Sequence, residues 1–260
     1  MPISALPRTI FRLSGEGVRE WLDGLITNNL LNEHTFAALL TPQGKIIADF
    51  FIQADGGDDD SLVLETAEKF GAHLFKRLKM YRMRAPIEIT DISDSHTVYA
   101  IWGGEGEAGM ADPRQPALGY RLITQDTLET TGDYNAHRLS LGIPDSAEDF
   151  ETASVFPADA CMDQINGVDF KKGCFIGQEV VSRMKRMTTV KKRMRGLVLG
   201  GGAAAGDKIM AGERVVGDVL SVQGEMAMGL VRLDRWKSAA VSPTINEADV
   251  KIMGAPDGSE

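Results

Sequence analysis

The chain has 260 residues, 43% of them hydrophobic, and a net charge of −9. No stretch approaches the roughly 20 apolar residues of a membrane span, and the acidic total argues against a general nucleic-acid binder. The first residues lack the pattern of a signal peptide or an Arg-rich presequence, and two cysteines make no disulfide scaffold, so we expect a reducing cytoplasm.

The first 102 residues predict short strands alternating with amphipathic helices. Val18, Trp21, Leu22 and Leu25 follow the spacing of one helical face. The run Thr41-Pro42-Gln43-Gly44-Lys45 separates two apolar stretches with turn residues and predicts a β-hairpin. We expect strands over 9–13, 36–40, 46–52, 61–66, 87–89 and 98–102, and a second helix over 67–79.

The remainder of the chain predicts a loop-rich middle followed by a β-rich end. Residues 103–118 read as a loop, 120–124 as a strand, 133–141 as a helix, 147–169 as irregular, and 178–187 as a helix. Short glycine-punctuated strands after residue 190 are typical of a small barrel. We therefore expect an α+β region over 1–190, made of two intertwined subdomains, and a β-barrel domain over 191–260. The expected barrel strands are 194–199, 208–210, 214–220, 227–232 and 248–253.

The run Lys172-Gly173-Cys174-Phe175-Ile176-Gly177-Gln178-Glu179 is the most informative feature. It places a thiol between glycines, beside lysines and ahead of a helix, where cations and N–H groups favour the thiolate. Residues 171–195 hold nine basic side chains and one acid, a local charge of +8 that leaves −17 on the rest. This contrast predicts an anionic partner, and Lys172 and Arg183, which flank the thiol, are candidates to hold it.

Each of these features also has a simpler structural interpretation. Cys174 is either a functional thiol or a small buried hydrophobic residue, as most free cysteines are, and for Cys161 we favour burial. The four cations Lys191, Lys192, Arg193 and Arg195 fit a solvated strand edge better than a binding strip.

Asp49 stands alone in the apolar strand 46–52 and is either a site acid or an outward-facing residue. The scattered histidines and the lack of a Cys-x-x-Cys pair give no support for a metal site. The chain also lacks a nucleotide-binding glycine loop.

The Cys174 run, with Arg183, resembles the signature of the YgfZ-like family. These are folate-binding relatives of the aminomethyltransferase (T-protein) of the glycine cleavage system, implicated in assembly or repair of iron–sulfur proteins. Further blocks look like those of the family in the same order. They are Leu13-Ser14-Gly15, Trp21-Leu22, Leu25-Ile26-Thr27-Asn28, Leu40 to Phe50, Tyr81-Arg82-Met83-Arg84, Arg138, Gly142-Ile143-Pro144 and Phe156-Pro157.

The resemblance implies a ring of α+β segments around a central channel for tetrahydrofolate, closed by a C-terminal barrel. It assigns Cys174 as the key thiol, with Asn28 and Asp49 lining the channel. The remaining folate- or anion-binding candidates are Lys172, Gln178, Glu179 and Arg183. Two departures argue against glycine cleavage: Ala48 replaces one of two adjacent acids, and Ser140 stands where the T-proteins carry a pterin-binding glutamate.

Three hypotheses follow, and whether the protein is an enzyme stays open among them. The first is a tetrahydrofolate-dependent accessory protein for assembly or repair of 4Fe–4S enzymes, with client or assembly proteins as partners. The second is a folate-dependent aminomethyl or one-carbon transferase. The third is a binding module, for example for RNA, that uses the basic strip 183–195 and loses affinity steeply with salt.

Overall fold

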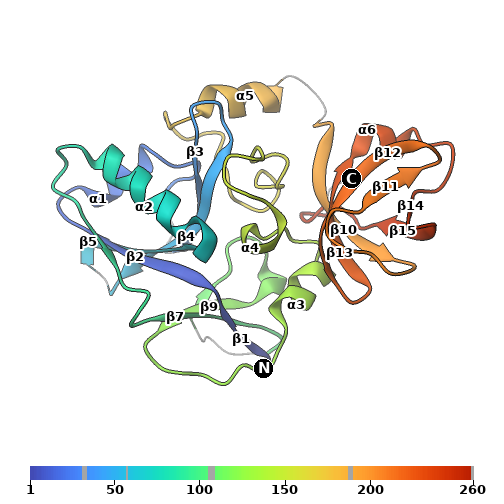
Figure 1. Cartoon of the computed structure of the whole chain (residues 1–260). Helices are drawn as coiled ribbons and strands as arrows, with labels where there is room; N and C mark the ends of the chain where they lie inside the picture. The colour runs from blue at the N-terminus through green and yellow to red at the C-terminus, as the bar shows by residue number, and fades with distance from the viewer. Residues whose placement is uncertain (31–33, 57, 105–108, 187–189, 259–260) are drawn as a thin grey trace.

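The computed structural model describes residues 1–30, 34–56, 58–104, 109–186 and 190–258. Three lobes meet around the short helix α4, two of them α+β and the third a closed barrel (Figure 1). The α+β class and the terminal barrel predicted from the sequence are both confirmed. The division into domains at residue 190 stays a prediction.

The first lobe is a five-stranded antiparallel sheet of order β3-β4-β5-β2-β6. The hairpin predicted around Gly44 is its β3–β4 pair, in which Ala38 lies opposite Asp49. Every residue of β3 is buried. The strands are β2 (Arg8–Ser14), β3 (His34–Leu40), β4 (Ile46–Asp55), β5 (Asp58–Ala67) and β6 (Glu88–Asp91).

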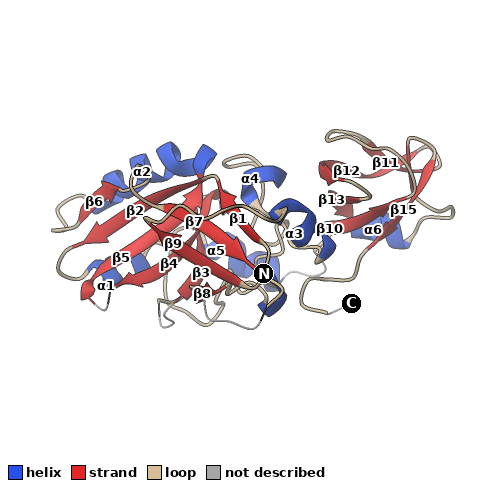
Figure 2. Cartoon of the chain, turned by 90° about the horizontal axis from the view of Figure 1, so that it is seen from below, coloured by secondary structure: helices blue, strands red, loops and turns tan. Residues whose placement is uncertain are grey.

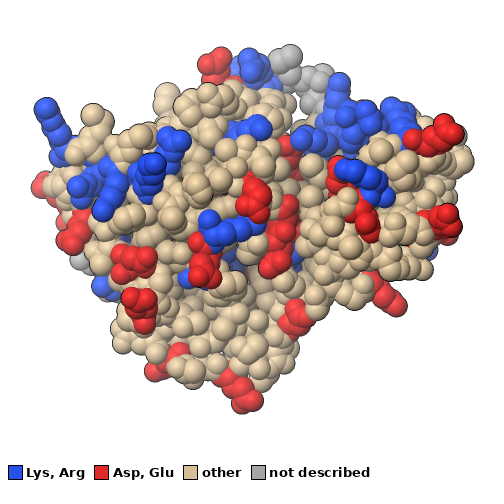
Figure 3. Space-filling model, viewed as in Figure 1, with Lys and Arg blue, Asp and Glu red and all other residues tan. Residues whose placement is uncertain are grey.

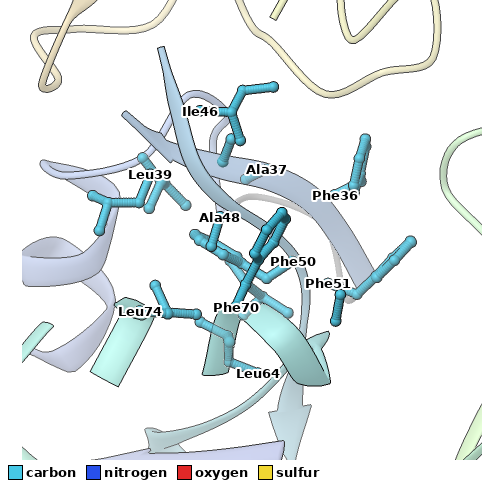
Figure 4. Packing of buried hydrophobic residues seen from close by; sticks show 14 of the residues in the cluster. Phe36, Ala37, Leu39, Ile46, Ala48, Phe50, Phe51, Leu64, Phe70 and Leu74 are labelled. Carbon is cyan, nitrogen blue, oxygen red and sulfur yellow. The ribbon is translucent and has the colours of Figure 1, made fainter. Parts of the chain in front are cut away.

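Helix α2 (Glu68–Arg82) covers this sheet through a stripe of apolar residues. Phe70, Leu74 and Leu78 recur every four residues and are buried. Figure 4 shows Phe70 and Leu74 against the side chains of β3 and β4. The predicted helix is therefore confirmed and runs three residues further than expected. The shorter α1 (Val18–Asp23) buries Val18 and Leu22.

The second lobe is a four-stranded sheet of order β1-β7-β9-β8. Its strands are β1 (Ile3–Leu6), β7 (Thr97–Ile101), β8 (Met110–Ala111) and β9 (Tyr120–Thr124), with the 3-10 turn η1 (Pro116–Leu118) before β9. Sequence reasoning missed β1 and β8, since each is too short to show a period. Helices α3 (Tyr134–Ser140) and α4 (Ser146–Asp149) then lead towards the barrel, each capped by an aspartate side chain.

The third lobe is the closed six-stranded barrel of order β10-β13-β12-β11-β14-β15. Before it comes α5 (Gln178–Arg186), which confirms the helix predicted after Cys174; Met187 lies outside the described residues. Figure 2 shows the barrel beside the two sheets. Its elements are β10 (Lys192–Leu199), β11 (Lys208–Ala211), β12 (Arg214–Gln223), β13 (Met226–Arg232), α6 (Leu233–Lys237), β14 (Thr244–Ile245) and β15 (Ala248–Ile252).

Candidate functional site

Cys174 lies exposed in the loop that precedes α5. The side-chain amide of Gln178, the first residue of the helix, donates to the carbonyl oxygens of Lys172 at 3.4 Å and Gly173 at 3.1 Å. The helix thereby holds the loop that carries the thiol. The interpretation of Cys174 as a buried hydrophobic residue is wrong, and its role as a functional thiol stays a prediction.

Lys172 fastens the same loop to the segment that follows α1. Its buried ammonium donates to the carbonyl oxygens of Asp23 at 2.6 Å, Ile26 at 3.1 Å and Asn28 at 2.9 Å. Burial lowers the pKa of Lys172, and the nearby Asp23 carboxylate, 3.2 Å away, opposes this. An ammonium has three hydrogens, so none is left for an anion. These contacts argue against the prediction that Lys172 holds an anion.

Two glycines join the thiol loop to the β3–β4 turn. Gly177 and Gly44 have φ of 80° and 81°, which favours glycine at both positions. A Cβ on Gly177 would lie 2.8 Å from the carbonyl oxygen of Thr41, and one on Gly44 would lie 2.9 Å from Cβ of Val180. The turn predicted at residues 41–45 therefore supports the start of α5 directly.

The cationic segment 171–195 does not form one continuous groove. Glu179 and Arg183 are exposed on α5, as are Lys185 and Arg186. Figure 3 shows Lys and Arg side chains along the upper edge of the molecule, where α5 lies in Figure 1. Arg193 instead forms a two-pronged ion pair with Asp163, and Lys192 lies 3.3 Å from Asp159. Arg195 is buried, with 6% of its surface exposed, so the solvated-edge interpretation is wrong for it.

Asn28 lines a central cavity of about 950 Å³ between the two sheets, together with His34, Phe36, Tyr120 and Asp169. The Asn28 amide donates to the carbonyl oxygens of Phe36 and Asn166, at 2.9 and 2.6 Å. Asn28 lies beside a cavity and its amide nitrogen already has protein partners, so its role in folate binding stays a prediction.

Beside this cavity six charged residues with buried side chains form a closed ring, which we call the charge ring. Cation and anion alternate: Arg8–Glu65 at 2.7 Å, Glu65–Arg121 at 2.5 Å, Arg121–Asp112 at 3.5 Å, Asp112–Arg114 at 2.8 Å, Arg114–Asp145 at 3.3 Å and Asp145–Arg8 at 4.0 Å. Desolvation opposes ionisation of Glu65 and Asp112, but the adjacent guanidinium groups outweigh it and hold both pKa values below normal. The side chains of the ring are therefore ionised, and its three cations and three anions leave it without net charge.

Phe51 lies against the charge ring. The guanidinium carbons of Arg121, Arg114 and Arg8 lie 3.9, 4.8 and 5.6 Å from the centre of its ring. Phe51 also packs against Phe36 and His34, which line the central cavity. Arg8, Asp145 and Tyr134 line a second cavity of about 260 Å³. The charge ring thus contributes residues to the lining of one cavity, and Phe51 contacts residues that line the other.

Asp49 lies on the same face of β4 as Phe51, two residues away. It is buried, so the outward-facing interpretation is wrong, and it does not line either cavity. Burial raises the pKa of Asp49, and Arg8 and a hydrogen bond from Ser146 only partly oppose this. Its Oδ1 has no hydrogen-bond partner among the described residues.

Sequence reasoning missed the charge ring because its members are spread from residue 8 to residue 145 with no motif. A weak signal exists: Glu65 stands among apolar residues in β5, as Asp49 does in β4. In the described part of the chain no three metal-binding side chains form a group. No described helix is long and apolar enough to cross a membrane.

Comparison with known structures shows that this is the fold of the aminomethyltransferases. The glycine cleavage system aminomethyltransferase T from Bartonella henselae superimposes with a TM-score of 0.75, covering 98% of this chain and 85% of that one, at 14% identity. At this identity the likeness concerns the fold alone. Residues 185–255 match the family model of the CAF17 C-terminal beta-barrel domain.

Sequence comparison finds relatives named iron-sulfur cluster assembly factor IBA57 homolog, mitochondrial. The protein from Phaeosphaeria nodorum is 31% identical over 79% of this chain and 57% of its own length. Those from Mycosarcoma maydis and Neurospora crassa are each 28% identical, over 72% and 74% of this chain and 54% and 52% of theirs. The chain therefore spans about half the length of these relatives, and it is similar to iron–sulfur assembly factors with an aminomethyltransferase-like fold.

The predicted cytoplasmic location is contradicted by these comparisons, because the relatives are named as mitochondrial proteins. The prediction rested largely on a low cysteine content. That property fits every reducing compartment and does not distinguish between them.

Proposed function

We propose that this protein is an accessory factor for the assembly or repair of 4Fe–4S proteins and that Cys174 is its key thiol. The names of the relatives support the class of function. The YgfZ-like signature around Cys174 supports the choice of residue.

The observation that carries this proposal is an exposed thiol on a loop anchored from two sides. Gln178 holds the loop from α5, and buried Lys172 holds it from the segment after α1. A 4Fe–4S cluster is normally held by four thiolates, whereas the other cysteine, Cys161, is buried. The cluster is therefore cargo, which Cys174 contacts while a partner protein supplies the remaining ligands.

Tetrahydrofolate is the proposed ligand of the central cavity. Phe36 and Tyr120 offer aromatic faces for a pterin, and Asp169 offers a carboxylate for its donor edge. These residues fit the pterin. No lysine or arginine is among the cavity's described lining residues, so the glutamyl tail must extend beyond it. Exposed Lys171 and Arg183, in the segment of Cys174, are the proposed partners of the tail.

A folate-dependent aminomethyltransferase is the second candidate, favoured by the fold. Two residues of this chain argue against it. Asp49, the retained acid, is enclosed and does not line the central cavity, and the Ser140 hydroxyl donates back to the carbonyl oxygen of His137. Turnover of an aminomethyl donor above background would favour the transferase.

The test of the main proposal compares Cys174→Ser with its neighbour Gly173→Ala. Gly173 is a matched control because a Cβ there meets no atom within 4 Å and φ is not positive. We expect Cys174→Ser to lose complementation of a strain deleted for this gene, and its 4Fe–4S enzyme activities to fall with it. Gly173→Ala should retain both, and both variants should unfold at the wild-type temperature.

Full complementation by Cys174→Ser contradicts the role of the thiol. A second measurement separates the folate proposal from the thiol proposal. Tetrahydrofolate should raise the melting temperature of wild type and Cys174→Ser equally, because the thiol does not line the central cavity. Absence of any shift would remove the folate proposal and leave the thiol proposal in place.

A further inference from the structure

A cavity of about 700 Å³ lies between the barrel and the C-terminal segment and shares no lining residue with the central cavity. Its apolar lining comes from Val190, Leu233, Ile252 and Met253. Its charged lining consists of three cations and one acid, in a chain whose acids outnumber its cations. The four charged residues are Arg193, Arg195, Lys237 and Asp234.

Two of these charges are already paired with neighbours. Arg193 forms a two-pronged ion pair with Asp163, and Asp234 lies 3.5 Å from Arg232. Arg195 and Lys237 remain, and among the described residues neither has a carboxylate within 4 Å. Within the part of the chain that the structure describes, the cavity therefore carries two cations without counter-ions.

Arg195 indicates an anion site more strongly than Lys237 does, because Arg195 is buried and Lys237 is exposed. Its Nη1, which carries two hydrogens, lies within hydrogen-bonding distance of three acceptors: Sγ of Cys161 at 2.9 Å, the carbonyl oxygen of Met194 at 3.0 Å and Oε1 of Gln164 at 3.3 Å. All three acceptors are neutral. Nε and Nη2 make no hydrogen bond to a described residue, and neither atom is fully buried. Arg195 as a whole lines the cavity.

The other deeply buried arginines have the carboxylate partner that Arg195 lacks among the described residues. Arg114, Arg121 and Arg138 each have a carboxylate within 3 Å. A buried cation without an anion is costly, and an anion that enters beside it recovers that cost. In Arg195 the two unpartnered nitrogens form one side of the guanidinium fork, the arrangement that matches a carboxylate or a phosphate.

We propose that this cavity binds a small organic anion that has a carboxylate or phosphate group and an apolar body. The charged group lies against Nε and Nη2 of Arg195, and Lys237, exposed on α6, adds a second positive charge at the rim. The apolar body packs against Leu233, Ile252 and Met253. This site is independent of Cys174 and of the folate proposal.

Isothermal titration with three probes tests the proposal: phenyl phosphate, inorganic phosphate and phenol. We expect phenyl phosphate to bind more tightly than either of the others, since it alone satisfies both the cations and the apolar lining. Lys237→Gln should weaken its binding roughly two- to fivefold, as expected for an exposed charge. Arg195→Gln should weaken it roughly ten- to a hundredfold, as expected for charged hydrogen bonds.

Lys251→Gln is the matched control, because Lys251 is exposed on the same barrel and does not line the cavity. It should leave binding unchanged. If Arg195→Gln fails to fold, the comparison of Lys237→Gln with Lys251→Gln still decides. The proposal is overturned if phenyl phosphate binds no better than phenol, or if the two lysine variants weaken its binding equally.

Discussion

Asp49 illustrates how a single side chain acquires an unusual state from its surroundings. It lies in a buried strand, near the acid Asp145 as well as the cation Arg8, and its Oδ1 makes no hydrogen bond to a described residue. Desolvation favours its neutral form, and this is why its pKa is raised. Asp145, by contrast, is flanked by Arg114 and Arg8, which overcome its desolvation and lower its pKa.

This environment gives a prediction for Asp49→Asn. Because the folded protein binds the Asp49 proton more tightly than the unfolded chain, wild type loses stability as pH rises from about 4 through the raised pKa. Asparagine has no such proton. The melting temperature of Asp49→Asn minus that of wild type should therefore increase over this range and then level off.

Asp126→Asn, at an exposed position in a loop, is the control and should show no comparable rise. Melting curves at half-unit pH steps measure both differences. A difference for Asp49→Asn that stays flat or declines with pH would contradict a raised pKa.

At the scale of elements, the contact between the β3–β4 turn and α5 sets the position of the thiol loop. Gly44 and Gly177 meet with positive φ, and each lacks room for a side chain. The turn chemistry of residues 41–45 therefore serves two purposes. It reverses the chain between two buried strands, and it supports the start of the helix that follows Cys174.

Gly177→Ala should disturb this contact. The added Cβ meets Thr41 at 2.8 Å with φ at 80°, which should cost roughly 1–3 kcal/mol of unfolding free energy. Urea denaturation measures the loss, and complementation should fall with it because the thiol loop shifts. Gly173→Ala, where space is open, should change neither. Equal stability of the two variants would mean that the contact does not constrain the loop.

At the scale of the whole molecule, the charge ring joins the two sheets. Arg8 and Glu65 belong to β2 and β5 of the first sheet, Arg121 belongs to β9 of the second, and Asp145 precedes α4. A fold like that of the aminomethyltransferases thus contains a set of buried ion pairs that connects its two sheets.

Arg121→Met tests how much the charge ring contributes to the free energy of unfolding. It leaves Glu65 and Asp112 buried with one partner fewer, and breaking a buried pair costs about 3–5 kcal/mol. Urea denaturation should show this loss. Lys208→Gln, which breaks an exposed pair with Asp218 on the barrel, should change stability little. A loss below about 1 kcal/mol for Arg121→Met would contradict the view that its charge is held by these partners.

Patterns within about fifteen residues predicted most of the secondary structure. The four-residue spacing in α2, the Pro-Gly turn before β4 and the glycine-punctuated barrel strands all lie where expected. Each of these signals is local and depends on backbone geometry that a short segment sets by itself. Helix α6 was missed because it has only five residues, of which Leu233 and Trp236 are partly buried against the barrel, too few to show an apolar stripe.

Site geometry was predicted less well, and the cationic segment 171–195 shows why. Its charge was counted correctly, but Lys172 and Arg195 point inward, Arg193 pairs with Asp163, and only part of the charge faces solvent. A count of charges does not show which way each side chain points. That direction depends on which distant segment packs against it.

By itself the sequence determined the α+β class, the terminal barrel and the loop that carries Cys174, because turn residues and apolar spacing act over a few neighbours. Only the tertiary structure decided that six charges from residues 8 to 145 close a ring, that Asp49 is buried, and that Arg195 borders a cavity with no described carboxylate within 4 Å of its guanidinium. The physical reason is that burial and ion pairing are set by contacts between segments far apart in the chain.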